Sequence, residues 1–501
     1  MCSSDLAIVP AVTAGAICQD KMRGGLALMM VTDLSDAEIV LGRLASRLVT
    51  VLGVIFCGLP VLAILTSLGG VDPVDVVTGT MVIIGVSVLC VCLAMTFSVW
   101  AASAHEALMA TYAAFAVWFL AFFAWTELRR GAGPAADLLQ FGNPVWLLLA
   151  GERQPAVRSP AVRLGFLIAS LIISAVLTSL AIWKIRTVTL RQNNTPARRR
   201  RPARLGALNR CLHGFGSPAA TIEGSPVLWR ELHHRPPTRW GQAIWRLYGV
   251  SSVFFAYASV FINPNIAPGT LAFIVSIGLL LVGVHSATVL AEERSHGSLD
   301  VLLATPLSSR SIVLGKWWGA FHPVPRLAVL AGLIAFGAAV GRSLFVAALA
   351  YSVLTTALVL AFGAFFTSLG LAIATWQPRI DRAVGFSVGA FLFLTIVYPA
   401  LVISTSRTGP DDVLLLWVSP FFGMYLPMGW ICWSSGMLFG GAFAMFFWTL
   451  FTAVAAGAIQ QATENSFDRL IGRVSEAPER AQSTRNPRTI QPQSRASSGR
   501  N

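Results

Sequence analysis

The amino-acid sequence predicts an all-α polytopic membrane protein, and three observations lead to this fold class. Of the 501 residues, 55% are hydrophobic and only 12% are charged, whereas an ordinary soluble domain carries about 25% charged residues. Long stretches contain no charge at all, and the Lys and Arg residues gather between those stretches. This pattern excludes a soluble enzyme and a disordered chain. It also makes the bilayer, not nucleic acid, the expected partner of the net charge of +14.

The predicted membrane-spanning helices are the windows that lack Asp, Glu, Lys and Arg. A crossing needs about 20 apolar residues. The windows are residues 48–71, 76–104, 107–126, 164–183, 247–291, 327–341, 343–378, 383–406 and 413–463. Together they predict roughly ten crossings, and the apolar stretch 6–17 is too short to add another.

Three of these windows need a finer interpretation. The window 247–291 is long enough for two crossings, broken at Asn263-Pro264-Asn265. The window 327–341 is short, so its helix is expected to begin upstream near His322. The window 413–463 contains prolines in its front part and one clean span near 436–460. Glycines four residues apart would allow close helix contacts, at Gly385/Gly389 and Gly436/Gly440.

The basic residues predict the orientation. The segments that we expect in the cytoplasm are 19–47, 184–246, 292–326, 376–382 and the tail 461–501, and they hold 30 of the 37 Lys and Arg residues. The 129–163 loop, with five arginines, is the one place where the bias weakens.

The sequence contains an internal repeat. At a constant offset of 273, residues 19–43 and 292–316 share nine identities in 25 positions. A second similarity pairs Asn143-Pro144 with Ser419-Pro420. The repeat predicts two similar halves, residues 1–188 and 225–463, joined by an Arg-rich cytoplasmic linker at 189–224 and followed by a mostly disordered tail at 464–501. We expect the first half to lack its first helix and to carry only part of its second.

The second copy of the repeat predicts a short helix between two spans. Gly297 and Ser298 provide a break and an N-cap, and Pro306 stops the helix. Three leucines at i, i+3 and i+4 form one apolar face, namely Leu299, Leu302 and Leu303. An exposed apolar face on the cytoplasmic side predicts a protein partner or the lipid surface.

Each copy also contains a start signal for the helix that follows. Ser308 is placed to cap a helix that runs on through Ile312 to Lys316. In the first copy, Ser35 and Glu38 have the spacing of a capping box.

The segment 292–316 (EERSHGSLDVLLATPLSSRSIVLGK), which follows a predicted span, resembles the coupling segment of type-2 ATP-binding-cassette (ABC) exporter permeases. The segment 225–232 (SPVLWREL) is similar to the connector helix of that family, and Asn143-Pro144 and Ser419-Pro420 resemble its short outer segments. The resemblance implies two tandem six-helix type-2 permease halves, the first truncated at its N-terminus, in the cell membrane. It also implies separate ATPase subunits as partners, two of them, and export as the direction of transport.

The resemblance assigns roles to particular residues. The ATPase-coupling segment comprises Glu292, Glu293, Arg294, Gly297, Ser298, Leu299, Leu302, Leu303 and Pro306. Its first-half counterpart comprises Asp20, Gly24, Leu26, Leu34, Ser35 and Glu38, and the connector helix contributes Trp229, Arg230 and Glu231. The charged residues would contact the ATPase surface, and the three leucines would fill its groove.

The first-half copy departs from the family pattern. Gln19-Asp20 replaces Glu292-Glu293, and Asp33 replaces Pro306. We therefore expect the two halves to couple unequally to ATP hydrolysis.

The source of energy is expected to lie outside the chain. The sequence holds no Gly-x-x-x-x-Gly-Lys-Ser/Thr phosphate loop, so the chain is not expected to bind ATP or to be an enzyme by itself. No span contains a charge that could carry a coupling ion. The seven cysteines show no paired spacing, and no cofactor, metal or catalytic residue is predicted.

Three functions remain open at this point. The first is the permease of an ABC exporter, and the second is a membrane scaffold or assembly factor of the same fold without transport. The third is a membrane-embedded enzyme, for which His233 and His234 beside Glu231 are the best candidates. The 15 Trp and 30 Phe residues suit either a lipidic substrate or ordinary lipid-facing helices, so no substrate is predicted.

Overall fold

The computed structural model describes most of the predicted helical regions. The described residues are 25–32, 34–67, 72–101, 106–108, 110–115, 159–193, 226–233, 267–295, 298–305, 307–340, 345–377, 379–405, 415–433 and 438–471, with isolated positions between 118 and 261. Every regular element in these ranges is a helix, and eight helical segments are long and apolar enough to cross a membrane. The predicted class of all-α polytopic membrane protein is confirmed.

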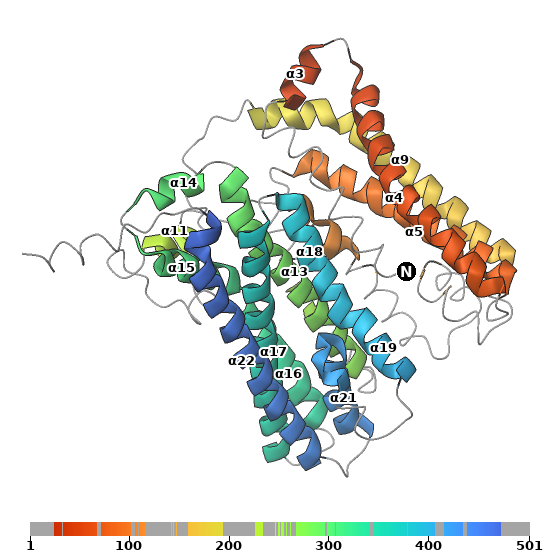
Figure 1. Ribbon diagram of the computed structural model, residues 1–501. Coiled ribbons are helices and arrows are strands. Elements are labelled where there is room, and N and C mark those ends of the chain that lie inside the picture. Colours follow the sequence, from red (N-terminus) through yellow and green to blue (C-terminus); the bar gives the residue numbers. More distant parts are fainter. Residues whose placement is uncertain are drawn as a thin grey trace, which may run out of the picture.

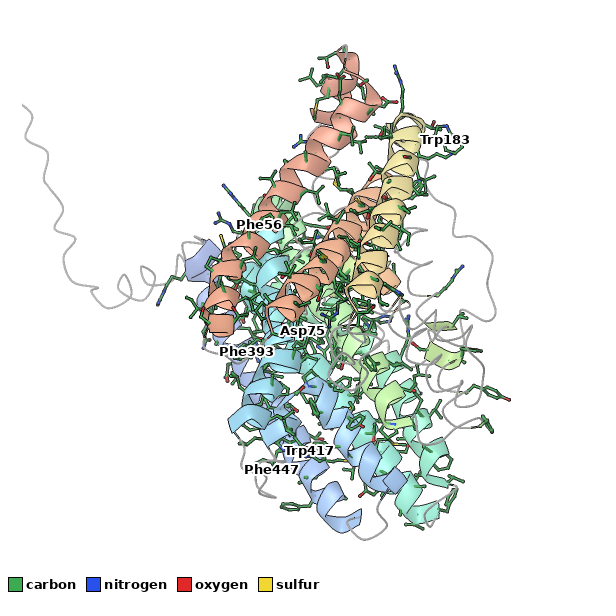
Figure 2. All side chains as sticks on the ribbon, turned by 90° about the vertical axis from the view of Figure 1, so that its right-hand side faces the viewer. Phe56, Asp75, Trp183, Phe393, Trp417 and Phe447 are labelled. Carbon is green, nitrogen blue, oxygen red and sulfur yellow. The ribbon has the colours of Figure 1, made fainter. Side chains whose placement is uncertain are left out.

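The first part of the chain forms a group of helices beside the rest (Figure 1). Its described helices are α3 (Gly25–Val31), α4 (Asp36–Ser67), α5 (Pro73–Trp100) and α9 (Pro160–Asn193). α5 and α9 pack closely along each other, and α4 contacts both. Phe56 of α4 and Trp183 of α9, both labelled in Figure 2, are 55% and 71% exposed, as lipid-facing side chains would be.

The second part forms a larger bundle around α17. Its helices are α11 (Pro226–His233), α13 (Ala267–Ser295), α14 (Ser298–Leu303), α15 (Ser309–Phe321), α16 (Val324–Val340), α17 (Phe345–Trp376), α18 (Ile380–Leu392), η5 (Phe393–Val397), α19 (Tyr398–Thr405), η6 (Leu416–Val418), α21 (Pro420–Trp433) and α22 (Leu438–Ile471). α17 contacts α13, α16, α18 and α22, so it is the central helix. Their shared core is apolar throughout and contains the fully buried Trp417.

The eight spans coincide with predicted windows. They are Asp36–Ile64, Pro73–Trp100, Pro160–Thr189, Ala267–Arg294, Ser309–Val340, Phe345–Trp376, Arg382–Ile403 and Gly440–Arg469. The window 107–126 and the front of the window 247–291 lie mainly outside the described residues. The total of ten crossings therefore stays a prediction.

Local start signals act where the sequence places them. Ser35 and Glu38 form the predicted capping box, since the Glu38 carboxylate accepts the Ser35 N–H at 2.8 Å and the Ser35 hydroxyl accepts the Glu38 N–H at 3.2 Å. The Ser308 hydroxyl caps α15 by accepting the Ser311 N–H at 3.3 Å. Asp72 caps α5 in the same way, directly before Pro73.

Two interruptions between helices of the bundle lie at or next to prolines. α15 and α16 are separated by a turn at His322 and Pro323, and the span that contains them begins at Ser309, so the predicted upstream start is confirmed. Between α18 and α19 the chain forms the π-helical turn η5, in which the Tyr398 N–H donates to the Phe393 carbonyl. Pro399 has no N–H for the Thr395 carbonyl, and the Ser419 hydroxyl donates to that carbonyl at 3.5 Å.

The bounds of several helices recur at the offset of the repeat. α4 covers 36–67, and the segment α15–α16 covers 309–340, which is the same range moved by 273. α5 and α17 also correspond within a few residues. α22 continues past the predicted half boundary at residue 463 and ends at Ile471.

Small residues bring α13, α17 and α18 into close contact. A Cβ atom at Gly370 would lie 2.0 Å from the Ser286 hydroxyl oxygen and 2.9 Å from the Gly283 carbonyl oxygen. The Ser387 hydroxyl donates to the same Gly283 carbonyl at 3.1 Å. Added Cβ atoms at Gly385 and Gly389 would meet no described atom within 4 Å. The close approach predicted at that pair lies instead at Gly283 and Gly370.

A Gly370→Ala substitution is therefore expected to destabilise the protein by about 1–3 kcal/mol, because the added methyl group overpacks the α13–α17 contact. Gly389→Ala is the matched control, and it is expected to be neutral or to stabilise its helix by up to about 1 kcal/mol. Thermal unfolding of both variants in detergent measures the difference. Equal midpoints for the two variants would contradict this packing.

Candidate functional site

The predicted coupling segment lies at one end of the large bundle, where α11, α14 and α15 gather (Figure 1). α14 connects the end of α13 to the start of α15, as the repeat predicts. Because a six-residue helix has no stability of its own, its position depends on what surrounds it.

A network of four charges, three of them buried, joins the elements around α14. The Lys316 ammonium of α15 lies 2.5 Å from one carboxylate oxygen of Glu293 and 3.3 Å from a carboxylate oxygen of Glu231. Arg230 of α11 pairs with Glu293 and lies 3.7 Å from Glu231. The side chains of Glu293 and Lys316 are 0% and 1% exposed. Two acids and two bases balance, so α11, the end of α13 and α15 are held in one fixed register.

This network accounts for how α11 and α15 are oriented around α14. It contributes much less to the free energy of folding. Removing charges from water costs several kcal/mol per ion, and ion pairing in the interior does little more than recover that cost. What the network adds is specificity, because the two carboxylates meet both bases only when α11 and α15 lie in this arrangement.

Glycines on α15 let α11 approach closely. A Cβ atom at Gly315 would lie 2.9 Å from Val227, and one at Gly319 would lie 3.1 Å from the Cβ atom of Glu231. Gly42, the repeat counterpart of Gly315, is exposed and has no described atom within 4 Å of an added Cβ. α11 therefore packs closely against Gly315 in the second half, and no described residue packs in this way against Gly42.

The predicted apolar face of α14 is buried inside this chain, although the sequence predicts an exposed face. Leu299 is 2% exposed and Leu302 is 7% exposed, with Leu303 packed beside them. The cluster that covers them consists of Val227, Leu290, Ile312, Val313, Leu371, Ala374 and Phe467. In this structure these leucines pack against residues of the chain itself, some nearby in the sequence and some distant. Val301, which is 71% exposed, marks the face of α14 that remains accessible.

The charged residues at the end of α13 also bind within the chain. Arg294 donates to the carbonyls of Ala374 and Thr375, at 3.3 and 3.0 Å, and so caps the end of α17. Glu293 belongs to the buried network, and Glu292 is only partly exposed. Glu293 and Arg294 thus have partners within the chain, and their predicted contact with an ATPase surface stays a prediction.

The other predicted site residues are scattered. Gly297, Pro306, Asp20 and Gly24 lie outside the described residues, as do the side chains of Ser298 and Leu26. Leu34 is 49% exposed, and Ser35 and Glu38 satisfy each other in the capping box. Trp229 lies half-buried on α11, between the bundle and solvent.

Sequence reasoning missed two groups of functional candidates. Lys316 has no predicted role of its own, because no spacing in the sequence links it to its partners Glu231 and Glu293. Arg163 of α9 is 4% exposed and pairs with Asp75 of α5 at 3.3 Å, also contacting the Thr78 hydroxyl at 2.5 Å. Asp75 and Arg163 each lie just outside a charge-free window. Asp75 lies in the first turn of α5 (Figure 2).

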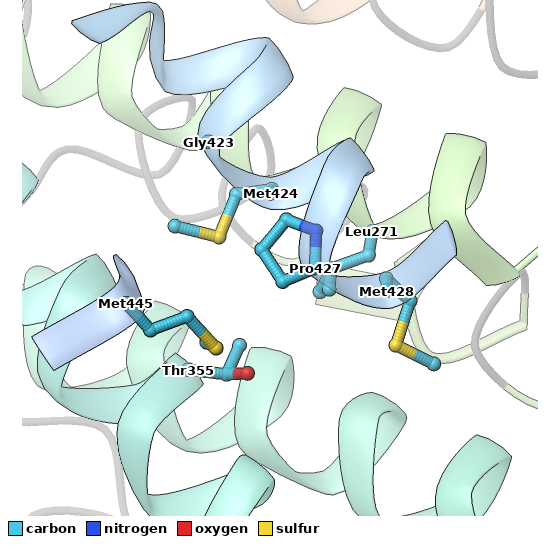
Figure 3. Close-up of a pocket in the computed structure, with 7 residues that line it drawn as sticks. All are labelled: Leu271, Thr355, Gly423, Met424, Pro427, Met428 and Met445. Carbon is cyan, nitrogen blue, oxygen red and sulfur yellow. The ribbon is translucent and has the colours of Figure 1, made fainter. Parts of the chain in front are cut away.

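The described residues contain no group of three or more His, Cys, Asp and Glu side chains that could hold a metal ion. A narrow crevice between α13, α17, α21 and α22 has no charged lining residue (Figure 3). It is lined by Leu271, Thr355, Gly423, Met424, Pro427, Met428 and Met445. Its surface is apolar apart from one hydroxyl, so it offers no acid–base or metal chemistry.

These helices define a multi-pass membrane protein in which a short helix between two spans, α14, is held by a charge network and a leucine cluster. The profile described as ABC-2 family transporter protein matches residues 159–421, just over half of the chain. The chain belongs to this family and is the membrane permease component of an ABC transporter. None of the curated proteins matches the chain. The matched range includes α9, α11, α14 and the four charged residues of the network, and it ends before α22.

Proposed function

We propose that this chain forms the translocation path of an ABC exporter and is driven by two separate ATPase subunits. One ATPase docks on α14, and the other docks on the α3 segment of the first half. The predicted topology places both helices on the cytoplasmic side. Export as the direction of transport follows from the resemblance of the coupling segment to type-2 exporters.

The observation that carries the proposal is the way in which α14 is fixed to the neighbouring helices. A short helix between two spans is fixed by a buried charge network and a buried leucine cluster, while Val301 faces outward. A rigid helix with one exposed face is what a subunit interface requires, because force applied to it passes directly to α13 and α15. The sequence contains no phosphate loop, which supports the proposal that another subunit hydrolyses ATP.

Two halves in one chain are supported by the recurrence of helix bounds. α4 corresponds to α15–α16 and α5 to α17, and the close pair α5–α9 matches the close pair α17–α22. The two docking helices differ, since Leu28 and Val31 of α3 are 71% and 85% exposed, while the leucine face of α14 is buried. We expect this difference to make coupling through α14 the stronger of the two.

A Val301→Asp substitution is expected to weaken ATPase association about tenfold or more, equivalent to at least 1.4 kcal/mol, because it places a charge at the centre of the docking face. Folding should be unaffected, since Val301 is 71% exposed. The measurement is affinity purification of the tagged chain from native membranes, with mass spectrometry and an ATPase assay.

The controls separate docking from general charge effects. Thr187→Asp adds the same charge at an exposed site near the end of α9 and should leave association unchanged. Leu28→Asp should weaken association less than Val301→Asp. A chain that purifies without any phosphate-loop ATPase would contradict the proposal. An ATPase that binds but shows no ATP-dependent turnover would favour the scaffold function instead.

A further inference from the structure

The cytoplasmic end of α22 reaches the coupling segment. Beyond the predicted half boundary, Phe467 is 1% exposed and belongs to the same buried cluster as Leu299 and Leu302. The next residue, Asp468, contacts the start of α15, where the Ser309 hydroxyl donates to the Asp468 carboxylate. Figure 1 shows this end of α22 beside α11, α14 and α15.

These contacts differ in strength. Arg310 pairs with Glu464 at 3.4 Å, but the Arg310 side chain is 77% exposed, and an exposed ion pair of this kind contributes little. Phe467 is fully buried, and the Ser309–Asp468 bond involves an ionised acceptor, which makes it the stronger type of hydrogen bond. Phe467 and Asp468 therefore carry the attachment.

We propose that the end of α22 is a second anchor of the coupling segment, and that Phe467 and Asp468 are positioning residues for coupling; this inference rests on the proposed function. The charge network holds α14 and α15 through α11 and α13, and α22 holds the same segment from the last span. The two anchors share no residue, so α14 is fixed on two sides.

Through this anchor, a movement of α14 is transmitted to the opposite side of the membrane. α22 has 34 residues, which corresponds to a length of about 51 Å. It packs against α17, and its Met445 reaches the crevice beside Met424 and Met428 of α21. A displacement of α14 is thus passed to the opposite end of the bundle through α22 and α17, without relying on the turn at Ala304 and Thr305.

The first experiment uses the purified chain alone. Amide hydrogen exchange in a peptide covering 298–305 should rise about fivefold or more in Phe467→Ala and in Asp468→Ala, because α14 loses one anchor. Arg469→Ala, which changes an exposed neighbour on the same helix, is the matched control and should not alter exchange. Asp468→Asn should give exchange between those of the wild type and Asp468→Ala, because its side-chain oxygen still accepts the Ser309 hydroxyl but without the charge.

The second measurement uses the complex with the ATPase. The ATPase rate per assembled complex should fall about fivefold in Asp468→Ala while the KM for ATP stays constant, whereas a folding defect would lower only the amount of complex. Unchanged exchange at 298–305 in both Phe467→Ala and Asp468→Ala would overturn the anchor. If the wild-type chain binds no ATPase, the proposed function fails, and hydrogen exchange still decides whether α22 anchors α14.

Discussion

Replacing Lys316 by methionine is expected to destabilise the protein by about 3–5 kcal/mol, because it leaves two carboxylates in the network with only one base between them. Glu293 is fully buried, so water cannot replace the lost partner. The expected result is a lower thermal midpoint in detergent and increased protease cleavage near α11 and α14.

Two further variants test the cause of this loss. Lys316→Met combined with Glu293→Gln restores a balanced network and should recover part of the lost stability. Lys184→Met removes the lysine that lies over the ring of Trp183, 4.0 Å from its centroid, on a half-exposed face, and should cost less than about 1 kcal/mol. A Lys316→Met protein as stable as the Lys184→Met protein would show that the network is not formed.

A Leu302→Asp substitution is expected to detach α14 from the bundle at a cost of at least about 3 kcal/mol, because it loses apolar packing and buries a carboxylate without a partner. Leu302 lies in the cluster that contains Val227, Leu371 and Phe467. Limited proteolysis should cut the segment 298–305 much faster than in the wild type, while the spans remain protected.

The neighbouring Val301→Asp variant is the control for this effect. Its side chain points outward, so proteolysis should match the wild type even though ATPase association is weakened. Equal protease sensitivity of Leu302→Asp and the wild-type chain would mean that the leucine face is open after all. The pair separates a defect in folding from a defect in docking.

Much of this fold follows from local sequence. The charge-free windows locate the spans because a charge near the centre of the bilayer is costly. The caps at Ser35 and Ser308 and the turn at Pro323 set helix starts to within a few residues, since each satisfies or removes particular backbone groups. The position and length of α14 could be predicted for the same reason.

The face that α14 presents could not be predicted locally. The spacing of Leu299, Leu302 and Leu303 shows that an apolar face exists, but not what covers it. The cover comes from α11, α17 and α22, and no sequence spacing relates Phe467 to Leu302. The partners of Lys316 were hidden for the same reason, because Glu231 lies 85 residues away and on a separate helix.

The prediction at Ser419-Pro420 illustrates an intermediate case. The proline marks the start of α21, whose 14 residues correspond to about 21 Å and are too few to cross the bilayer. The second role of Ser419, donating to a carbonyl that Pro399 leaves without a partner, depends on two helices meeting in space. Sequence could locate this element but not its contact.

The most direct test of the docking site is photo-crosslinking from position 301 in native membranes. With a benzophenone amino acid in place of Val301, we expect a crosslink to a phosphate-loop ATPase. The same amino acid in place of Phe447, which is 53% exposed on α22 and lipid-facing in the predicted topology, should give none. A probe at position 301 that labels only lipid, or only this chain, would contradict the assignment of α14 as the docking helix.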